Sequence, residues 1–355
     1  MTIEIKHSEY LAPWRVVFYA ALIIFICSGF APLRAGRFDI NVEVQAGYDD
    51  NVLDYSDADL DLFTDPSEPQ NKYGIISKDD YIIVPAVDIA YKTFLAGHSL
   101  HLGVINSYAY YKENDVKRYY RLEGYFRRYF ARGVYFQGNV TYLPDYYYRN
   151  SYSLLNAYEE AKFDKLIFEG KLSMQLTNKI QANAFYGYSN KDFIPHFDDR
   201  DINQHEITGQ FVYRPNHLWK GWVSYGFIRA VGAGKDNSNY PRDTSFDMNS
   251  FVAGSRLYLH GINRRSWQLA GYVAFDQVFF QTDKITEQDK YRLGRQDHRW
   301  YIALMTEHSV NRNMGVGFEY RRMVKNVDLP ASAAYLIPSL EANSNSYFFV
   351  VNYHL

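Results

Sequence analysis

The sequence predicts an all-β protein, a transmembrane antiparallel up-and-down β-barrel of about fourteen strands. Three observations lead to this prediction. Apolar and polar residues alternate along many segments, short turns alternate with long polar loops, and aromatic residues are abundant although the mean hydropathy is negative. The 355 residues include 34 Tyr and 24 Phe. Much aromatic mass without net hydrophobicity indicates apolar residues dispersed among polar ones, as on strands with one apolar face.

The alternation is clearest from Phe38 to Ala46, where even-numbered residues are apolar or Ala and odd-numbered residues are Asp, Asn, Glu or Gln. Successive side chains of a strand face opposite sides, so this segment has one apolar and one polar face. Comparable segments recur, each near the roughly 9–11 residues that a tilted membrane strand needs. Their approximate centres are residues 42, 87, 105, 124, 138, 169, 184, 209, 223, 254, 271, 302, 318 and 350.

The connections between these segments are of two kinds. Short turns built of turn-forming residues are expected at 96–99, 131–133, 177–179, 214–217, 260–263 and 309–313. Long polar loops are expected at 49–80, 144–158, 190–202, 230–247, 280–297 and 324–344, with one brief connection at 112–117. This sorting is typical of membrane barrels, which have short periplasmic turns and long extracellular loops.

Residues 1–35 are predicted to be a cleaved signal peptide, which leaves residues 36–355 as a single barrel domain. An apolar stretch, Val16 to Cys27, follows Lys6 and Arg15 and precedes small residues. At roughly 12 residues it is too short for a transmembrane helix. An uncleaved anchor is the alternative. Cys27 is the only cysteine, so we expect neither disulfides nor thiolate chemistry in the mature domain.

Composition and motifs also exclude several classes of function. The formal net charge of −2 argues against nucleic-acid binding, which needs a basic surface. The sequence contains no phosphate-binding glycine loop, zinc motif or nucleotide fingerprint, so we expect no cofactor.

Two segments resemble bacterial outer-membrane proteins. The alternating end of the chain, Tyr347 to Leu355, resembles the terminal strand that the barrel-assembly machinery reads, although that family usually ends in Phe or Trp. The segment Ala46 to Leu53, with its glycine-aromatic-Asp-x-Asn strand exit, is similar to poorly characterised barrel porins, some linked to exopolysaccharide export. The resemblance implies a location in the bacterial outer membrane, in contact with lipid and lipopolysaccharide. Tyr142 to Arg149 is a second candidate signature, without an assigned mechanism.

Charged residues on the polar faces are predicted to line the lumen, because an Arg or Lys facing lipid at the membrane midplane costs roughly 2–4 kcal/mol. They could select solutes in a water-filled pore, or simply hold the barrel shut through salt bridges. The candidates are Lys92, Arg121, Glu123, Arg127, Lys171, Glu206, Arg256, Asp276, Arg299, Glu307, Glu319 and Arg321.

Other polar clusters lie in the expected loops. Asp57, Asp59 and Asp61 could ligate Ca²⁺, although a solvated acidic loop is the simpler interpretation. His196 and His205, with intervening aspartates, could form a hydrolytic or metal site at the rim. Tyr146 to Tyr148 could belong to an interfacial aromatic girdle or stack against sugars.

These features favour a non-enzymatic channel that lets small polar or sugar-like solutes pass passively. A closed or plugged barrel that serves surface binding or polysaccharide export is the alternative, and a rim hydrolase is the third. Bulky lumen residues decide between the first two, namely Arg121, Tyr125, Arg127, Trp222 and Tyr301.

Overall fold

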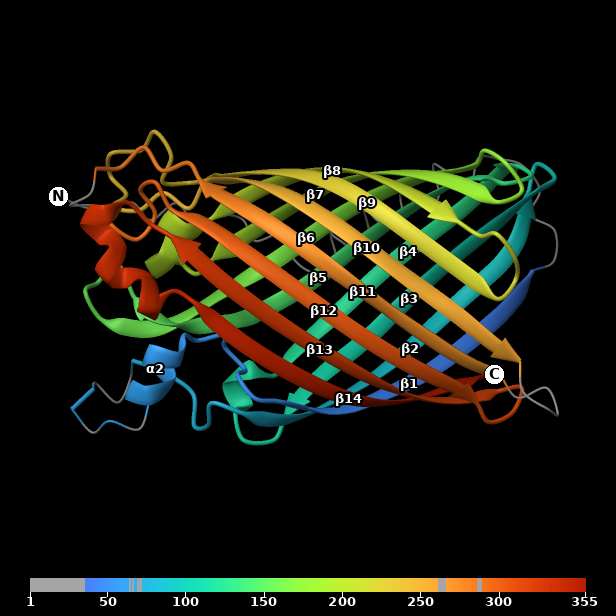
Figure 1. Ribbon diagram of the computed structural model, residues 1–355, viewed down its shortest axis with the longest axis horizontal. Helices are drawn as coiled ribbons and strands as arrows, with labels where there is room; N and C mark the ends of the chain where they lie inside the picture. The colour runs from blue at the N-terminus through green and yellow to red at the C-terminus, as the bar shows by residue number, and fades with distance from the viewer. Residues whose placement is uncertain (1–35, 64, 66, 69–71, 261–265, 286–288) are drawn as a thin grey trace.

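The computed structural model is a closed antiparallel β-barrel of fourteen strands (Figure 1). It describes residues 36–63, 65, 67–68, 72–260, 266–285 and 289–355, and the predicted signal peptide lies outside this range. The strands are β1 (Arg37–Asp49), β2 (Asp80–Leu95), β3 (His98–Tyr111), β4 (Tyr119–Ala131), β5 (Val134–Tyr152), β6 (Tyr158–Gln175), β7 (Ile180–Phe193), β8 (Ile202–Tyr213), β9 (Trp219–Gly232), β10 (Phe246–His260), β11 (Ser266–Phe280), β12 (Gln296–Ser309), β13 (Met314–Asp328) and β14 (Ala342–His354).

Each strand pairs with its neighbours in sequence, and β14 pairs with β1 to close the barrel. The closing seam runs from Asn41 opposite His354 to Asp49 opposite Ser346. The predicted fold class and strand number are therefore confirmed. The strands are longer than predicted, from 12 residues in β8 to 19 in β5.

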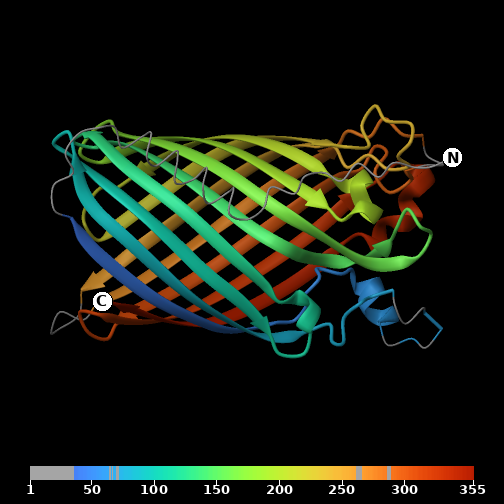
Figure 2. The ribbon, with the colours of Figure 1, turned by 180° about the vertical axis from the view of Figure 1, so that it is seen from behind.

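The connections are sorted between the two ends of the barrel as predicted (Figure 1). One end carries the short turns, apart from the turn expected at 260–263, which lies almost wholly outside the described residues. The other end carries the long loops with α2 (Asp57–Leu62) and the 3₁₀ helices η1 (Asp115–Lys117), η2 (Pro195–Arg200) and η4 (Ala331–Ser339). The expected long loop at 144–158 is wrong. There β5 and β6 continue as a hairpin that projects at the loop end, joined only by residues 153–157 (Figure 2).

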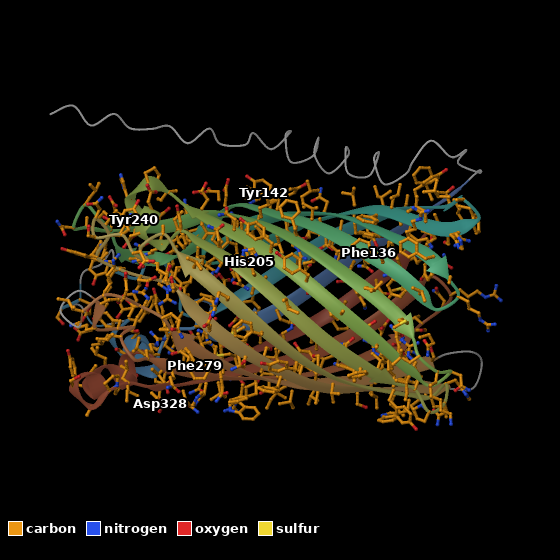
Figure 3. All side chains as sticks on the ribbon, turned by 90° about the horizontal axis from the view of Figure 1, so that it is seen from above. Phe136, Tyr142, His205, Tyr240, Phe279 and Asp328 are labelled. Carbon is orange, nitrogen blue, oxygen red and sulfur yellow. The ribbon has the colours of Figure 1, made fainter. Side chains whose placement is uncertain are left out.

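The two faces of the wall differ in chemistry as the alternation predicts. The outward face is a band of exposed large apolar side chains, such as Ile83, Ile207, Val223, Leu269 and Phe318. Hydrogen bonding between strands leaves the closed wall without an edge, so this band can face lipid without unpaired backbone groups. Side chains cover the whole wall, with Phe136 near the turn end and Tyr240 and Asp328 near the loop end (Figure 3).

No helix in the described part of the chain is both long enough and apolar enough to cross a membrane.

Candidate functional site: the lumen and its loop-end mouth

The strand register places all of the predicted lumen residues on the inward face. Pairing connects this face around the barrel, for example through Asn41 opposite Asp88, Glu123 opposite Thr141 and Asp276 opposite Arg299. The full inward set of predicted residues is Lys92, Arg121, Glu123, Arg127, Lys171, Glu206, Arg256, Asp276, Arg299, Glu307, Glu319 and Arg321.

Most charged lumen groups are held by neighbours along the wall. Arg121 Nη2 lies 2.6 Å from Glu123 Oε2, and Arg321 Nε lies 2.7 Å from Glu319 Oε1. Thr208 donates a hydrogen bond of 2.9 Å to Glu206. Each of these pairs joins positions two apart on one strand, so it does not fasten one strand to another. Other lumen charges do bridge strands, since Lys92 pairs with Asp39 and Arg127 donates to Gln137, but these partners belong to the adjacent strands, so the contacts fit a lined wall better than a salt-bridged plug.

Bulky inward residues also lie along the wall. Tyr125 donates a hydrogen bond of 3.0 Å to Asp88, and its ring covers Gly103. Trp222 stands opposite Gly254, and a Cβ added to that glycine would lie 2.2 Å from the indole ring. Missing side chains at the two glycines create the space that these rings occupy. The rings consequently lie against the backbone of the adjacent strand.

The segment Ala46 to Leu53, the first sequence signature, fixes the start of the β1–β2 loop, residues 50–79. Asp50 accepts hydrogen bonds from the backbone N and the Nδ2 of Asn345, at 2.7 and 2.8 Å. Asn51 donates to the carbonyls of Tyr55 and Asn343, at 2.8 and 2.9 Å, and its Oδ1 accepts from Tyr55 N at 2.9 Å. Since Asn343 and Asn345 belong to β14, these bonds tie the loop to the closing seam.

The segment Tyr142 to Arg149, the second sequence signature, introduces two irregularities into the pairing of β5. The pairing of β5 with β6 shifts between Leu143 and Tyr146 and again between Tyr147 and Arg149, and Asp145 adopts a positive φ of 45°. Such bulges redirect side chains locally. Tyr147 is thereby almost fully buried, at 1% exposure, and its hydroxyl lies 3.1 Å from Asn150 Oδ1. A membrane-interface girdle is therefore the wrong role for this tyrosine.

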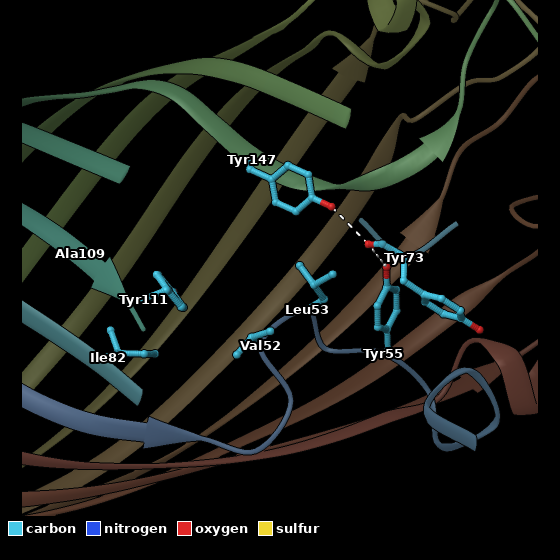
Figure 4. Packing of buried hydrophobic residues seen from close by; sticks show 8 residues of the cluster. All are labelled: Val52, Leu53, Tyr55, Tyr73, Ile82, Ala109, Tyr111 and Tyr147. Atoms are coloured by element: carbon cyan, nitrogen blue, oxygen red, sulfur yellow. Dashed lines mark hydrogen bonds between the residues drawn. The ribbon is translucent and has the colours of Figure 1, made fainter. Parts of the chain in front are cut away.

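The two signatures meet in one apolar cluster, which also contains Ile82, Ala109 and Tyr111 from the strand ends (Figure 4). Val52, Leu53 and Tyr55 from the loop are each less than 9% exposed. The hydroxyls of Tyr55 and Tyr147 both approach the carbonyl oxygen of Tyr73, at 3.4 and 3.3 Å (Figure 4). The cluster holds the β1–β2 loop against the bulged part of β5 and narrows the loop-end mouth.

Two cavities lie beside this cluster. The outer one, of about 460 Å³, is lined by loop residues that include Tyr55, Asp59 and Tyr291. The inner one, of about 580 Å³, is lined by strand residues that include Lys191, Tyr301 and Met323. Both are in the size range of small-molecule sites. Eight residues line both cavities, namely Asp54, Tyr148, Arg149, Arg200, Phe280, Arg292, Arg299 and Lys325.

Five of these shared residues are cationic, and we call Arg149, Arg200, Arg292, Arg299 and Lys325 the basic ring. Asp54 is the one carboxylate among the shared residues, and its Oδ1 accepts a 2.9 Å hydrogen bond from Ser344. Burial, together with the guanidinium groups of Arg242 and Arg292, lowers the pKa of Arg200 to about 10. With five cations and one carboxylate, the lining that the two cavities share carries a strong positive charge.

A third cavity, of about 500 Å³, lies toward the turn end and has a mixed lining of both charges, including Asp39, Lys92, Glu123 and Arg127. The predicted lumen thus has balanced charge at one end and an excess of cations at the other. Sequence patterning did not identify Arg149, Arg200, Arg292 or Lys325, because all four fall in segments that were expected to be long loops and only the fold brings them together.

The calcium hypothesis gains no support from the geometry. Asp57, Asp59 and Asp61 belong to helix α2, where Asp59 Oδ2 accepts a hydrogen bond of 3.0 Å from Ser56, the residue that caps the helix. Alternate positions on a helix point in different directions, unlike those of an extended loop. Over the described residues, no group of three or more His, Cys, Asp or Glu side chains is arranged to hold a metal ion.

The two histidines of the suggested hydrolytic site have separate surroundings. His196 lies in η2 and pairs with Glu159 at 3.0 Å. His205 is not in a loop as predicted. It lies in β8 on the outward face, where its Nδ1 is 2.9 Å from the Tyr186 hydroxyl (Figure 3). The alternation of β8 between faces explains the error, since polar His205 follows the apolar register.

A closed barrel with an exposed apolar band outside and a polar lumen inside has the architecture of an outer-membrane β-barrel. No protein-family model matches the chain, and no curated protein matches it. Among solved structures it is similar to a bacterial polysaccharide outer membrane secretin, with 8% identity, a TM-score of 0.46 and coverage of 88% of this chain and 98% of that one.

It is also similar to the outer membrane channel DcaP of Acinetobacter baumannii, with 10% identity, a TM-score of 0.45 and coverage of 92% and 100%. An anion-selective porin from Comamonas acidovorans gives 8% identity, a TM-score of 0.44 and coverage of 90% and 99%. At these identities the similarity concerns the barrel fold alone.

Proposed function

We propose that the protein is an outer-membrane channel through which small polar or sugar-like solutes diffuse. The observation that carries this proposal is the lumen itself, which has polar-lined cavities at both ends and charged side chains held along its wall. Diffusion through such a lumen requires no cofactor. Membrane lipid contacts the outer apolar band, and recognition of β14 by the assembly machinery stays a prediction.

Liposome swelling tests the proposal directly. Liposomes that contain the folded protein are transferred into solutions of sugars of graded size. We expect swelling rates that decrease with solute size, and steady conductance steps in a planar bilayer. A correctly folded barrel that admits none of the solutes and carries no current would refute the channel.

The apolar cluster at the loop-end mouth favours a second candidate, a closed barrel that serves surface binding or polysaccharide export. Under this hypothesis the apolar cluster, which includes Leu53 and Tyr147, closes the mouth. Replacing both by Ala should then turn a silent barrel into a conducting one. If wild type and variant conduct equally, the cluster is a structural support beside an open passage. The rim hydrolase has no comparable support, because His196 and His205 have separate partners.

A further inference from the structure

The basic ring has an unusual electrostatic arrangement. Arg299 on β12 stands directly opposite Lys325 on β13, and both side chains face the lumen. Like charges directly opposite each other on neighbouring strands destabilise a sheet. A second such inward pair, Lys165 opposite Lys191, lies across β6 and β7, and Lys191 lines the inner cavity. The wall thus keeps cations together where neutral residues would be more stable.

Carboxylates compensate for only part of this charge. Arg299 contacts Asp297 at 3.1 Å, and Arg292 contacts Asp289 at 3.0 Å. Both aspartates are nearly fully buried and line neither cavity. Within the described part of the chain, Arg149, Arg200 and Lys325 have no carboxylate at ion-pair distance. The Nε–H groups of Arg149, Arg200 and Arg299 are buried without a hydrogen-bond partner.

Aromatic groups occupy the positions around these cations. The Arg149 guanidinium lies 4.6 Å from the Tyr148 ring centroid and 5.4 Å from that of Tyr55. Both tyrosines line the outer cavity, together with Tyr152, Tyr158 and Tyr291. Tyrosine offers a flat apolar face and a hydroxyl that can donate or accept, which suits a hydroxylated ring-shaped solute.

Unpaired guanidinium donors are costly when buried, and an oxyanion satisfies them with charge-assisted hydrogen bonds. We propose that the basic ring binds the carboxylate of a sugar acid whose hydroxylated body rests against the tyrosines of the outer cavity. The inference rests on the proposed channel function and names the class of solute that the mouth prefers.

Isothermal titration calorimetry of the full barrel domain in detergent, with D-glucuronate and with D-glucose, tests the inference without requiring conduction. We expect glucuronate to bind and glucose to bind at least about tenfold more weakly, since the two differ at one carboxylate. The double variant Arg149→Gln/Lys325→Gln should lose about tenfold in glucuronate affinity per cation removed, or roughly 1.4 kcal/mol each.

The charge-matched control is Arg132→Gln/Arg312→Gln, which removes two exposed cations from turns at the opposite end of the barrel. It should keep the wild-type affinity. Folding of every variant is checked by the heat-dependent shift of the barrel on gels. Equal binding of glucose and glucuronate, or undiminished glucuronate binding by the double variant, would overturn the inference.

Current measurements separate this inference from the channel proposal. In a potassium chloride gradient, we expect a reversal potential that indicates anion preference and a smaller preference in the double variant. A barrel that binds glucuronate but carries no current refutes the channel and keeps the binding site. A conducting barrel that ignores glucuronate refutes only the binding site.

Discussion

Gly254→Ala tests whether glycines on the inward face let the large lumen rings lie flat against the wall. An added Cβ would lie 2.2, 2.4 and 2.9 Å from three atoms of the Trp222 ring. Carbon atoms in contact prefer separations of about 3.5–4.0 Å, so the ring must move by roughly 1.5 Å. The backbone of β10 blocks movement into the wall, and the only free direction is toward the lumen.

We expect Gly254→Ala to lower single-channel conductance and to destabilise the barrel by about 1–3 kcal/mol, the usual cost of overpacking. Urea unfolding in lipid vesicles measures the stability, and planar bilayers measure the conductance. Gly187→Ala is the matched control, because Gly187 on β7 also faces the lumen and a Cβ there would meet its nearest atom, the Glu206 Cβ, at an ordinary contact distance of 3.5 Å.

The double variant Trp222→Ala/Gly254→Ala completes the cycle. Removing the ring removes the clash, so conductance should return to the wild-type value or exceed it. The coupling free energy between the two sites should fall in the range of about 0.5–3 kcal/mol expected for contacting residues. If Gly254→Ala behaves like Gly187→Ala in both assays, the account of the lumen wall is refuted.

Three further predictions concern the loop, a buried lysine and the register. Asn51→Ala should leave buried backbone groups without hydrogen bonds, which destabilises the loop by about 1–3 kcal/mol. Proteolysis of residues 50–79 should therefore be faster while the barrel stays folded, and an unchanged cleavage rate would contradict this. Burial lowers the pKa of Lys117 to about 8, below its usual 10.5, so the folded state loses stability when this group is charged. Lys117→Met should therefore raise the melting temperature most below pH 8, with the gain fading toward pH 10.5, and a gain independent of pH would argue against it. Leu269→Arg should lower the free energy of unfolding by roughly 2–4 kcal/mol, because Leu269 faces lipid. The control Gln268→Arg, at the neighbouring inward position, should lower it much less. Equal losses by urea unfolding would show that the register is wrong.

Strand positions and faces were predictable because the membrane imposes a simple rule on each residue. A charge such as Arg121 or Glu307 is cheap only on the inward face, so local alternation was enough to place it. The predictions that failed concern residues whose environment depends on more than local alternation. Whether Tyr147 faces lipid or packs inside depends on two bulges in β5, and the sequence does not reveal where a register shifts.

The loop-end mouth was less predictable for a related reason. Arg149 and Lys325 are 176 positions apart in the sequence and come together only because β5 and β13 end at the same mouth. The calcium hypothesis for Asp57, Asp59 and Asp61 assumed an extended loop, whereas these residues form a six-residue helix. The sequence singled out Asp50 and Asn51, but only the structure shows that their hydrogen bonds to β14 hold the loop.

The pairing of lumen charges along single strands has a consequence for how the lumen can vary. Arg121 with Glu123 and Arg321 with Glu319 can each be exchanged as a unit without removing a bond between strands. At these positions the interior chemistry is thus separable from the scaffold, so the charge of the lumen can change while the hydrogen-bonded wall stays the same.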